Sequence, residues 1–199
     1  MSNIFTQKRV IADPPIAKFL FSDTRMAIVW LVVRLYVGYA WIEAGLHKVQ
    51  DPAWMDSGAA LKGYLLNAAK LPVGAARPNI TFDWYRSFLQ FLIDQQAYTW
   101  FGKVIALGEA AVGIALILGA FVGIAAVAGA FMNMNYLLAG TASTNPVLLV
   151  LAILLILAWK TAGFIGLDKI LLPIIGTPWR SRHDKAAPQL SPAPLVAPV

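Results

Sequence analysis

Four ionisable side chains stand in long apolar stretches of this sequence, and they are its first candidates for chemistry. Arg34, Glu43 and His47 belong to the stretch AIVWLVVRLYVGYAWIEAGLHK, and Glu109 lies in a second apolar stretch. A charge inside a hydrocarbon layer costs about 2.5 to 3.5 kcal/mol on insertion scales, so it is expected to face protein or trapped water. Carboxylates and an imidazole in such places can hold and transfer protons. We therefore predict that Arg34, Glu43, Glu109 and His47 are the catalytic residues.

The composition predicts an integral membrane protein. Of the 199 residues, 59% are hydrophobic and 13% are charged, and the mean hydropathy is +0.66. At about 1.5 Å per residue, some 20 helical residues cross the roughly 30 Å hydrocarbon core of a bilayer. We interpret the net charge of +6 as a consequence of the orientation of the protein in the membrane and of its contact with anionic lipid. We do not interpret it as a sign of nucleic-acid binding.

The sequence excludes several kinds of cofactor site. It has no cysteine, which excludes disulfides, iron–sulfur clusters and thiolate metal sites. Its two histidines are His47 and His183, and the second stands in a polar tail, so one chain is not expected to hold a haem between two histidines in the membrane. No Gly-rich nucleotide-binding pattern is present either. The sequence thus carries no metal, haem or flavin signature.

The hydrophobic pattern predicts an all-α bundle of four transmembrane helices. The predicted spans cover residues of about 27–48, 101–118, 121–139 and 146–165. Between the first two spans, the insertion 49–100 is predicted to hold a short helix over 59–69. An aromatic-rich helix from about 82 to 101, with Thr81 as a possible N-cap, lies either in the membrane interface or against the end of the bundle. Small residues such as Gly113 and Gly129 predict close packing of the helices.

The distribution of basic residues predicts the orientation. Lysines and arginines flank the start of the first span and the end of the fourth, whereas the loop between spans three and four has none. We therefore place both termini in the cytoplasm, as an N-terminal tail over 1–26 and a basic, then Pro/Ala-rich tail over 173–199. The insertion 49–100 is placed on the outer side.

Depth along the helices predicts partners for the buried charges. Arg34 and Glu109 lie about 10 and 13 Å from the inner ends of their spans, so we expect them to pair. Such a pair would either fix the register of the two helices or take part in the function of the protein. Asn133 lies at about the depth of Glu43 and is expected to form a hydrogen bond with it, worth near 1 kcal/mol.

The first span presents two different polar faces. Arg34, Trp41, Gly45 and Lys48 share one face, and Tyr36, Glu43 and His47 share the opposite one. If both faces are buried, this helix is central to the bundle or meets a partner. His47 is interpreted either as a residue that caps the helix end or as part of a proton path from Glu43 to the outer water.

Five segments follow one another in an order that is typical of a known family. They are RLYVGYAWIEAGLHKVQDPAW, ALKGYL, GEAAVGIALILGAF, NMNYLLAGTASTNP and WKTAGFIGLDK. In this order, over about residues 27 to 172, they resemble the DoxX/DoxD family of small four-helix membrane proteins. The part from DPAW to GYL is similar to the DoxD branch, which includes the membrane subunit of thiosulfate:quinone oxidoreductase. The polar positions of the family fall here on Arg34, Glu43, Lys48, Glu109, Asn133, Asn135, Asn145 and Asp168.

The resemblance implies an oxidoreductase in the cytoplasmic membrane of a prokaryote. Such a protein oxidises thiosulfate to tetrathionate and passes the electrons to a diffusible quinone, alongside a small partner subunit or as a homo-oligomer. In this interpretation Glu43, Glu109 and His47 supply protons. The basic residues of the outer side attract the anion, and they are Lys48, Arg77, Arg86 and Lys103. The residues expected to bind quinone or substrate are Tyr39, Trp41, Lys48, Asn133 and Asn135.

Two other functions remain open from the residues alone. One is a non-catalytic membrane subunit that anchors a redox or respiratory complex. In such a subunit Arg34 and Glu109 would fix the register of two helices, and the insertion would be a docking surface. This hypothesis needs no redox group in the chain. A small transporter or proton channel is disfavoured, because four spans form a narrow bundle and no pair of broken helices is visible.

Overall fold

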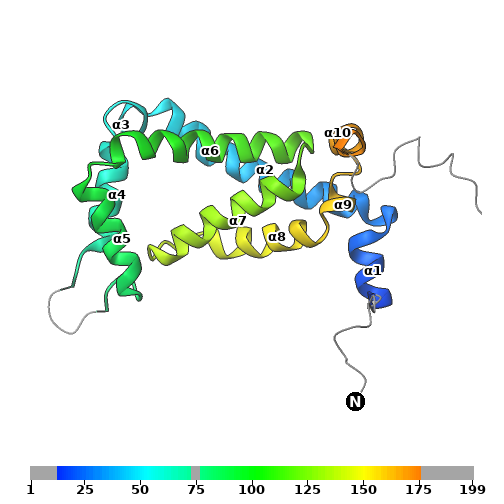
Figure 1. Ribbon diagram of the computed structural model, residues 1–199, viewed down its shortest axis with the longest axis horizontal. Coiled ribbons are helices and arrows are strands. Elements are labelled where there is room, and N and C mark those ends of the chain that lie inside the picture. Colours follow the sequence, from blue (N-terminus) through cyan, green and yellow to red (C-terminus); the bar gives the residue numbers. More distant parts are fainter. Residues whose placement is uncertain (1–12, 73–76, 176–199) are drawn as a thin grey trace, which may run out of the picture.

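In the computed structural model, residues 13–72 and 77–175 are described, and all regular structure in these ranges is helical. Figure 1 shows a bundle of long helices with shorter helices across both of its ends. The elements are α1 (Pro15–Ser22), the 3-10 helix η1 (Thr24–Met26), α2 (Ala27–Gln50), α3 (Pro52–Met55), α4 (Ala59–Ala69), α5 (Asp83–Asp94), α6 (Tyr98–Leu118), α7 (Val122–Leu138), α8 (Asn145–Leu157), α9 (Trp159–Ala162) and α10 (Asp168–Ile175).

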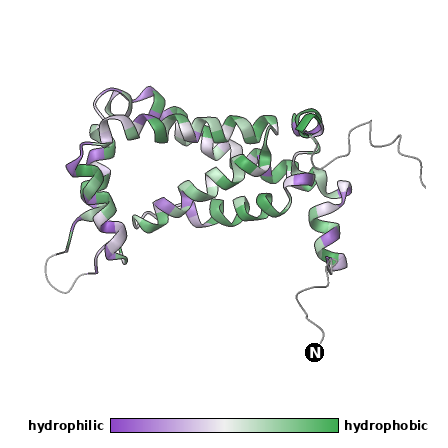
Figure 2. Cartoon of the chain, viewed as in Figure 1, coloured by the Kyte–Doolittle hydropathy of each residue, from purple (hydrophilic) through white to green (hydrophobic). Residues whose placement is uncertain are grey.

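Two of the helices are long and apolar enough to cross a membrane. One is the continuous stretch Thr24–Gln50, which joins η1 and α2, and the other is α6. α7 and α8 are apolar but shorter. The predicted fourth span, 146–165, is interrupted at Ala158, where α8 ends and the short α9 follows. Figure 2 shows hydrophobic residues along most of α6 and α8 and hydrophilic residues towards the end that carries α3, α4 and α5.

α2 and α6 pack with their backbones in direct contact. A Cβ atom at Gly45 would overlap the backbone nitrogen of Ala110, and one at Gly113 would lie 2.5 Å from the backbone nitrogen of Ile42. Glycine lets two helices approach this closely in a membrane, where dispersion contacts replace the hydrophobic effect as the main attraction. The two helices are therefore antiparallel and are fixed in one register.

This contact gives the first testable prediction, which compares two glycine-to-alanine substitutions. Gly45→Ala is expected to lower stability by about 2 kcal/mol or more, because the new methyl group meets backbone that no rotamer change can move. Gly63→Ala is the matched control. A Cβ at Gly63 meets nothing within 4 Å, so the substitution is expected to raise stability slightly through the greater helix propensity of alanine. Thermal unfolding of the two variants in detergent measures both effects, and equal melting temperatures would contradict the predicted packing.

The short helices α3, α4 and α5 form a cap over one end of the bundle. α2 has 24 residues and α6 has 21, about 36 and 32 Å, whereas α7 has 17 and α8 has 13, about 26 and 20 Å. The cap lies across the end where this difference in length leaves space (Figure 1). Its own core contains Leu61, Leu65, Tyr85 and Leu89. The cap therefore covers the end of the bundle at which α7 and α8 are shorter than α2 and α6.

The sequence predicted one cap helix correctly and the other in part. α4 spans Ala59–Ala69, as expected for 59–69. The aromatic-rich helix begins at Asp83 with Phe82, not Thr81, at the N-cap position. It does not run on to 101, because Gln96 adopts a positive φ of 51° and breaks the chain into α5 and α6. The break lets α5 turn away from the long axis of α6.

The opposite end of the bundle carries α1 and α10. The predicted tail over 1–26 contains α1, which is attached to the bundle because Thr161 donates to the carbonyl of Phe21 at 2.7 Å. Trp30 also donates to the carbonyl of Leu20 at 2.7 Å. The basic and Pro/Ala-rich tail predicted over 173–199, including His183, lies outside the described residues beyond position 175. Both described ends of the chain therefore lie at one end of the bundle.

Candidate functional site

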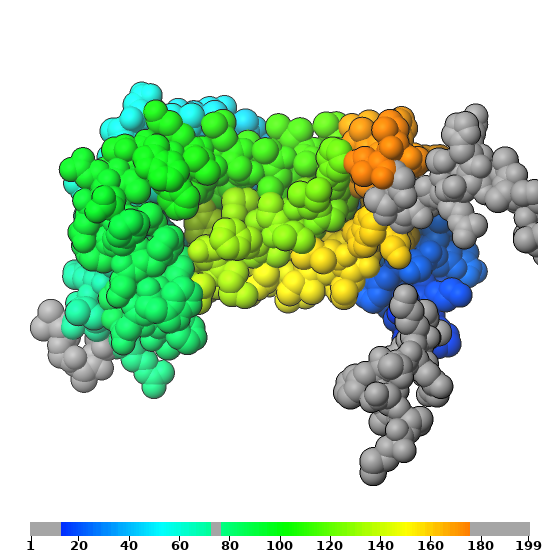
Figure 3. Space-filling view, viewed as in Figure 1, coloured from blue at the N-terminus to red at the C-terminus, as the bar shows by residue number. Residues whose placement is uncertain are grey.

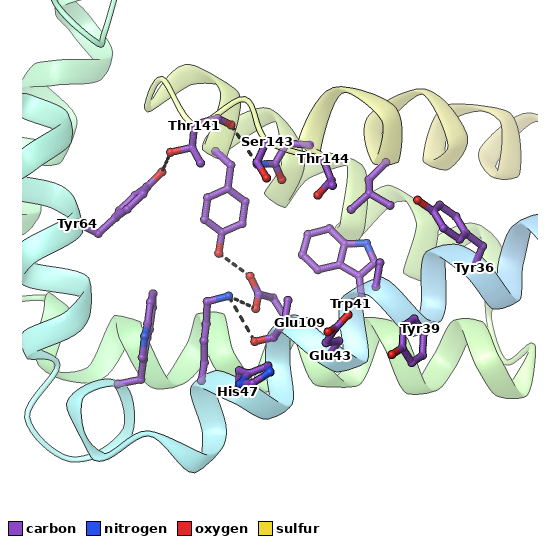
Figure 4. A pocket seen from close by; sticks show the side chains of 17 residues that line it. Tyr36, Tyr39, Trp41, Glu43, His47, Tyr64, Glu109, Thr141, Ser143 and Thr144 are labelled. Carbon is purple, nitrogen blue, oxygen red and sulfur yellow. Dashed lines mark hydrogen bonds and ion pairs between the residues drawn. The ribbon is translucent and has the colours of Figure 1, made fainter.

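A cavity of about 620 Å³ lies between α2, α6, α7 and α8, next to the cap. Six of the predicted site residues line it: Tyr39, Trp41, Glu43, His47, Lys48 and Glu109. They come from α2 except Glu109, which α6 supplies. Figure 4 shows Glu109 between the α2 side chains and a group of hydroxyl residues from the cap and the α7–α8 loop. The sequence therefore predicted one side of the cavity.

Glu109 is the buried charge at the centre of this cavity. Its side chain is 1% exposed, and its Oε2 accepts from Nζ of Lys48 at 2.5 Å. Its Oε1 accepts from the hydroxyl of Tyr136 at 2.5 Å. A buried carboxylate needs a cation and further hydrogen bonds to offset its desolvation, and Lys48 and Tyr136 provide both. We refer to Lys48, Glu109 and Tyr136 as the Glu109 cluster.

Aromatic rings surround the lysine of this cluster. Nζ of Lys48 lies 5.3 Å from the ring centroid of Trp54 and 5.9 Å from that of Tyr136. A cation above an aromatic face gains electrostatic attraction, and more so where water is excluded. The rings thus hold the ammonium group towards Glu109 and complete the polar end of the cavity.

Tyrosine hydroxyls connect the cavity to the cap. The hydroxyl of Tyr64 and Oγ1 of Thr141 are 2.8 Å apart, and the ring of Tyr64 meets that of Tyr136 edge-on at 6.2 Å. Burial raises the pKa of Tyr64 above its ordinary value. Burial also raises the pKa of Tyr85, whose hydroxyl donates to the carbonyl of Asn135 at 2.9 Å, to about 12. These hydroxyls therefore stay protonated at neutral pH and remain hydrogen-bond donors.

Glu43 and His47 form a polar rim on the outer side of α2. They stand one helical turn apart, both are exposed, and both line the cavity as well as a shallow groove beside Gln50. Of the two predicted faces of the first span, only the one with Arg34, Trp41 and Gly45 is buried. Glu43 and His47 thus lie where the cavity meets its surroundings.

The predicted pair of Arg34 and Glu109 is wrong. Arg34 is buried at the other end of the bundle and donates to the carbonyls of Ala162 and Ile165, at 2.8 Å each. It also lies against Gly119 in the turn between α6 and α7. Glu109 takes Lys48 as its cation instead.

The register of α2 and α6 explains this error. Gly45 lies beside Ala110, and Gly38 lies beside Ile117. Leu46 is thus about level with Glu109, twelve residues or about 18 Å along the axis from Arg34. The depth calculation assumed that the two helices end in one plane, whereas α2 continues well past the end of α6. Arg34 is therefore not part of the cavity.

The two predicted asparagines also lie away from the cavity. Asn133 is fully buried in α7, and its side-chain atoms form no hydrogen bond within the described residues, so the expected bond to Glu43 is absent there. Glu43 lies on the exposed face of α2, which prevents that contact. Asn135 donates to the carbonyl of Phe131 and accepts from Tyr85, at the edge of a separate apolar groove. Neither side chain forms a hydrogen bond with Lys48, Glu109 or Tyr136.

Sequence reasoning missed several residues of the site, among them Trp54, Tyr64, Tyr136 and Thr141. The sequence could have pointed to Tyr136, because it stands three positions after Asn133 and therefore lies near the same face of one helix. Trp54, Tyr64 and Thr141 come from the cap and a loop, which helical periodicity does not place. Their positions depend on how the cap folds back over the bundle.

The cavity combines an apolar, aromatic wall with a few hydrogen-bonding groups at one end. This combination is typical of sites that bind small organic molecules. Within residues 13–72 and 77–175, no three His, Asp or Glu side chains gather as metal ligands would. No protein-family model, curated protein or solved structure matches this chain.

Proposed function

We propose that the chain is the membrane subunit of a quinone-linked oxidoreductase and crosses the membrane four times. The two long apolar helices support this, and so do α7 and the combined α8 and α9. Residues 145–162 would extend about 27 Å, close to the thickness of the hydrocarbon core. The cap then lies on the outer side of a prokaryotic cytoplasmic membrane, and both termini lie inside.

The buried Glu109 cluster carries the proposal that the cavity receives a quinone ring. Lys48 and the hydroxyl of Tyr64 provide donors for carbonyl oxygens, and Trp41 provides an aromatic wall. Reduction of a quinone to a quinol takes two electrons and two protons. In this proposal the Glu109 cluster delivers protons to the ring, and Glu43 and His47 restore them from water. Each proposed role uses a residue that lines the cavity.

Thiosulfate is the proposed electron donor, on the basis of the family resemblance. Two thiosulfate ions joined through a new S–S bond give one tetrathionate and two electrons, which matches one quinone. Of the basic residues expected to attract the anion, Arg77 and Lys103 are exposed. Lys48 pairs with Glu109, and Arg86 pairs with Asp83 at 2.5 Å. Of these four residues, Arg77 and Lys103 are therefore the ones that face the outer solution in this proposal.

Quinone reduction by the purified protein in lipid nanodiscs tests the proposal. With thiosulfate and a short-chain quinone, we expect the quinone absorbance to fall and tetrathionate to appear in a one-to-one ratio. Nanodiscs without protein, and protein without thiosulfate, are the controls. A folded protein that shows no turnover, and that neither quinone nor thiosulfate stabilises against heat, would contradict the proposal.

The second candidate is a non-catalytic subunit that anchors a redox complex. One observation favours it: α5 exposes large aromatic side chains, with Trp84 and Phe91 63% and 58% exposed. Trp84, Phe88 and Phe91 are spaced at helical intervals and form one stripe on α5. In this candidate function the stripe is a docking surface. Loss of activity would then follow loss of assembly in every variant.

A further inference from the structure

The cavity changes in character along the axis of α2. Its polar end holds the Glu109 cluster, Tyr64 and Thr141, next to the cap. Its other end is lined by Tyr36, Tyr39, Ala40 and Leu148. Tyr36 stands twelve residues before Lys48, so the cavity extends over about 18 Å of α2. A molecule that fits this shape has a polar ring at one end and an apolar part at the other.

The apolar end of the cavity is open between α2 and α8. Tyr36 and Tyr39 are 52% and 62% exposed although they line the cavity. α2 packs mainly on α6, through its glycine face, and α8 packs mainly on α7, so the direct contact between α2 and α8 is limited and leaves a slit beside the cavity. Figure 4 shows Tyr36 and Tyr39 on α2 at the side of the cavity away from the cap.

The position of the slit along the membrane normal decides what can pass through it. Ala40 lies thirteen residues from the start of α2 and ten from its end, near the middle of a helix of 24 residues. If α2 crosses the membrane, as proposed above, the slit opens into hydrocarbon and not into water. Molecules dissolved in the bilayer can then enter through it, whereas ions such as thiosulfate are excluded.

We propose that the cavity takes a quinone with a long aliphatic tail, which enters sideways from the bilayer between α2 and α8. The ring reaches the Glu109 cluster, and the tail leaves through the slit past Tyr36, Tyr39 and Ala40. This inference rests on the proposed function and names the class of quinone and its path. Glu43 and His47 lie on the same face of α2, nearer the cap, and in this proposal polar substrates reach the cavity there.

A second apolar groove offers the competing path for a tail. It has a volume of about 140 Å³ and lies between α5, α6 and α7, where Figure 3 shows a hollow in the surface. Phe88, Phe101 and Phe131 line it. The rings of Tyr64 and Tyr136, which meet edge-on, line both this groove and the cavity and stand between the groove and the pair formed by Lys48 and Glu109. A tail in this groove would therefore have to pass a closed aromatic contact.

Single cysteines test the path directly, because the natural chain has none. Ala40→Cys places a thiol in the slit, and Phe131→Cys places one in the competing groove. Each variant is modified with a bulky lipid-soluble maleimide and compared with itself before modification. We expect modification at position 40 to lower turnover of a long-tailed quinone by about tenfold or more and to affect a tail-less quinone with the same ring much less. Modification at position 131 is expected to change neither rate.

Two results of the turnover measurement would overturn the inference. One is equal inhibition of both quinones by modification at position 40, and the other is inhibition of the long-tailed quinone by modification at position 131 only. If neither unmodified variant reduces any quinone, the proposed function fails instead, and protection then tests the path. A bound long-tailed quinone is expected to slow the reaction of maleimide with the thiol of Ala40→Cys and not with that of Phe131→Cys. Equal reaction rates with and without quinone would overturn the inference.

Discussion

Glu109→Gln is expected to abolish quinone reduction while the protein still folds and inserts. Glutamine has nearly the same shape, and its side-chain oxygen can still accept from the hydroxyl of Tyr136. It no longer binds or releases a proton in the relevant pH range, and it leaves the ammonium group of Lys48 without its counter-charge. Loss of a positioned proton-transfer group typically costs about 10²- to 10⁴-fold in rate. The measurement is turnover in nanodiscs per folded molecule.

The control for this variant separates chemistry from stability. In Glu109→Gln the half-buried Lys48, whose side chain is 19% exposed, becomes an unpaired charge, which lowers stability. The double variant Lys48→Gln and Glu109→Gln removes both charges, so it is expected to recover much of the lost stability but none of the activity. Recovery of both together would show that the Glu109 cluster serves folding only.

Glu43→Gln is the positional comparison on the rim. Glu43 is exposed and lies on the opposite face of α2 from Gly45, so its replacement is expected to leave stability unchanged. Its proposed role is the supply of protons from water, which His47 and solvent can share. We therefore expect a smaller loss of rate than for Glu109→Gln. A loss as large as that of Glu109→Gln would assign the main proton transfer to the rim.

The sequence allowed the helices to be predicted better than their mutual register. α4 has the predicted bounds because Gly58 and the Leu71-Pro72 step limit it locally. Gly113 was predicted at a helix contact and lies against Ile42. The partner of Arg34 was not predictable from depth alone, because the offset between α2 and α6 depends on which glycines meet. A register is a property of two surfaces and is not encoded in either helix by itself.

In the candidate site, too, some residues were predictable from the sequence and others were not. Glu109 was identifiable as a buried carboxylate from its apolar surroundings, and Lys48 shares the buried face of α2. Tyr64 and Thr141 were not identifiable, because they meet only when the cap and the α7–α8 loop fold over the shorter helices. The cavity itself arises from the unequal lengths of α2 and α8, and the bounds of α8 were predicted too long at 146–165. The existence and volume of the cavity therefore could not be predicted from residue types.

A large loss of stability is expected at the opposite end of the bundle, where Arg34→Met should lower the free energy of unfolding by about 3 to 5 kcal/mol. Methionine fills a similar volume but donates no hydrogen bond. The carbonyls of Ala162 and Ile165 would lose their donor, and Asp168 would lose its nearby positive charge. Thermal or denaturant unfolding in detergent measures the loss.

Arg25→Met is the matched control for this substitution. Arg25 also pairs with an aspartate, Asp23 at 2.6 Å, but its side chain is 77% exposed. Water replaces the partner of an exposed arginine with little change in stability. A similar loss for Arg25→Met and Arg34→Met would show that burial of the guanidinium group does not matter.

The contacts of Asp168 explain why Arg34 is needed and how pH should change its effect. The carboxylate of Asp168 accepts from the backbone of Phe121 and Val122 at 2.5 and 2.9 Å, so it caps the start of α7. Burial raises the pKa of Asp168, while these backbone bonds and the charge of Arg34 lower it. Without Arg34 the pKa of the folded state rises further above that of the unfolded state. Such a group stabilises the fold most below its unfolded pKa, and this contribution is lost as the pH rises through the folded pKa.

The destabilisation by Arg34→Met is therefore expected to be smaller in mild acid than at neutral pH. Protonation of Asp168 removes the uncompensated charge, although it also weakens the cap on α7. Asp168→Asn in the Arg34→Met background should abolish this pH dependence and should cost less than Asp168→Asn in the natural chain. A double-mutant cycle measured at both pH values gives the coupling between the two side chains. A coupling near zero would mean that Arg34 acts only through the carbonyls of Ala162 and Ile165.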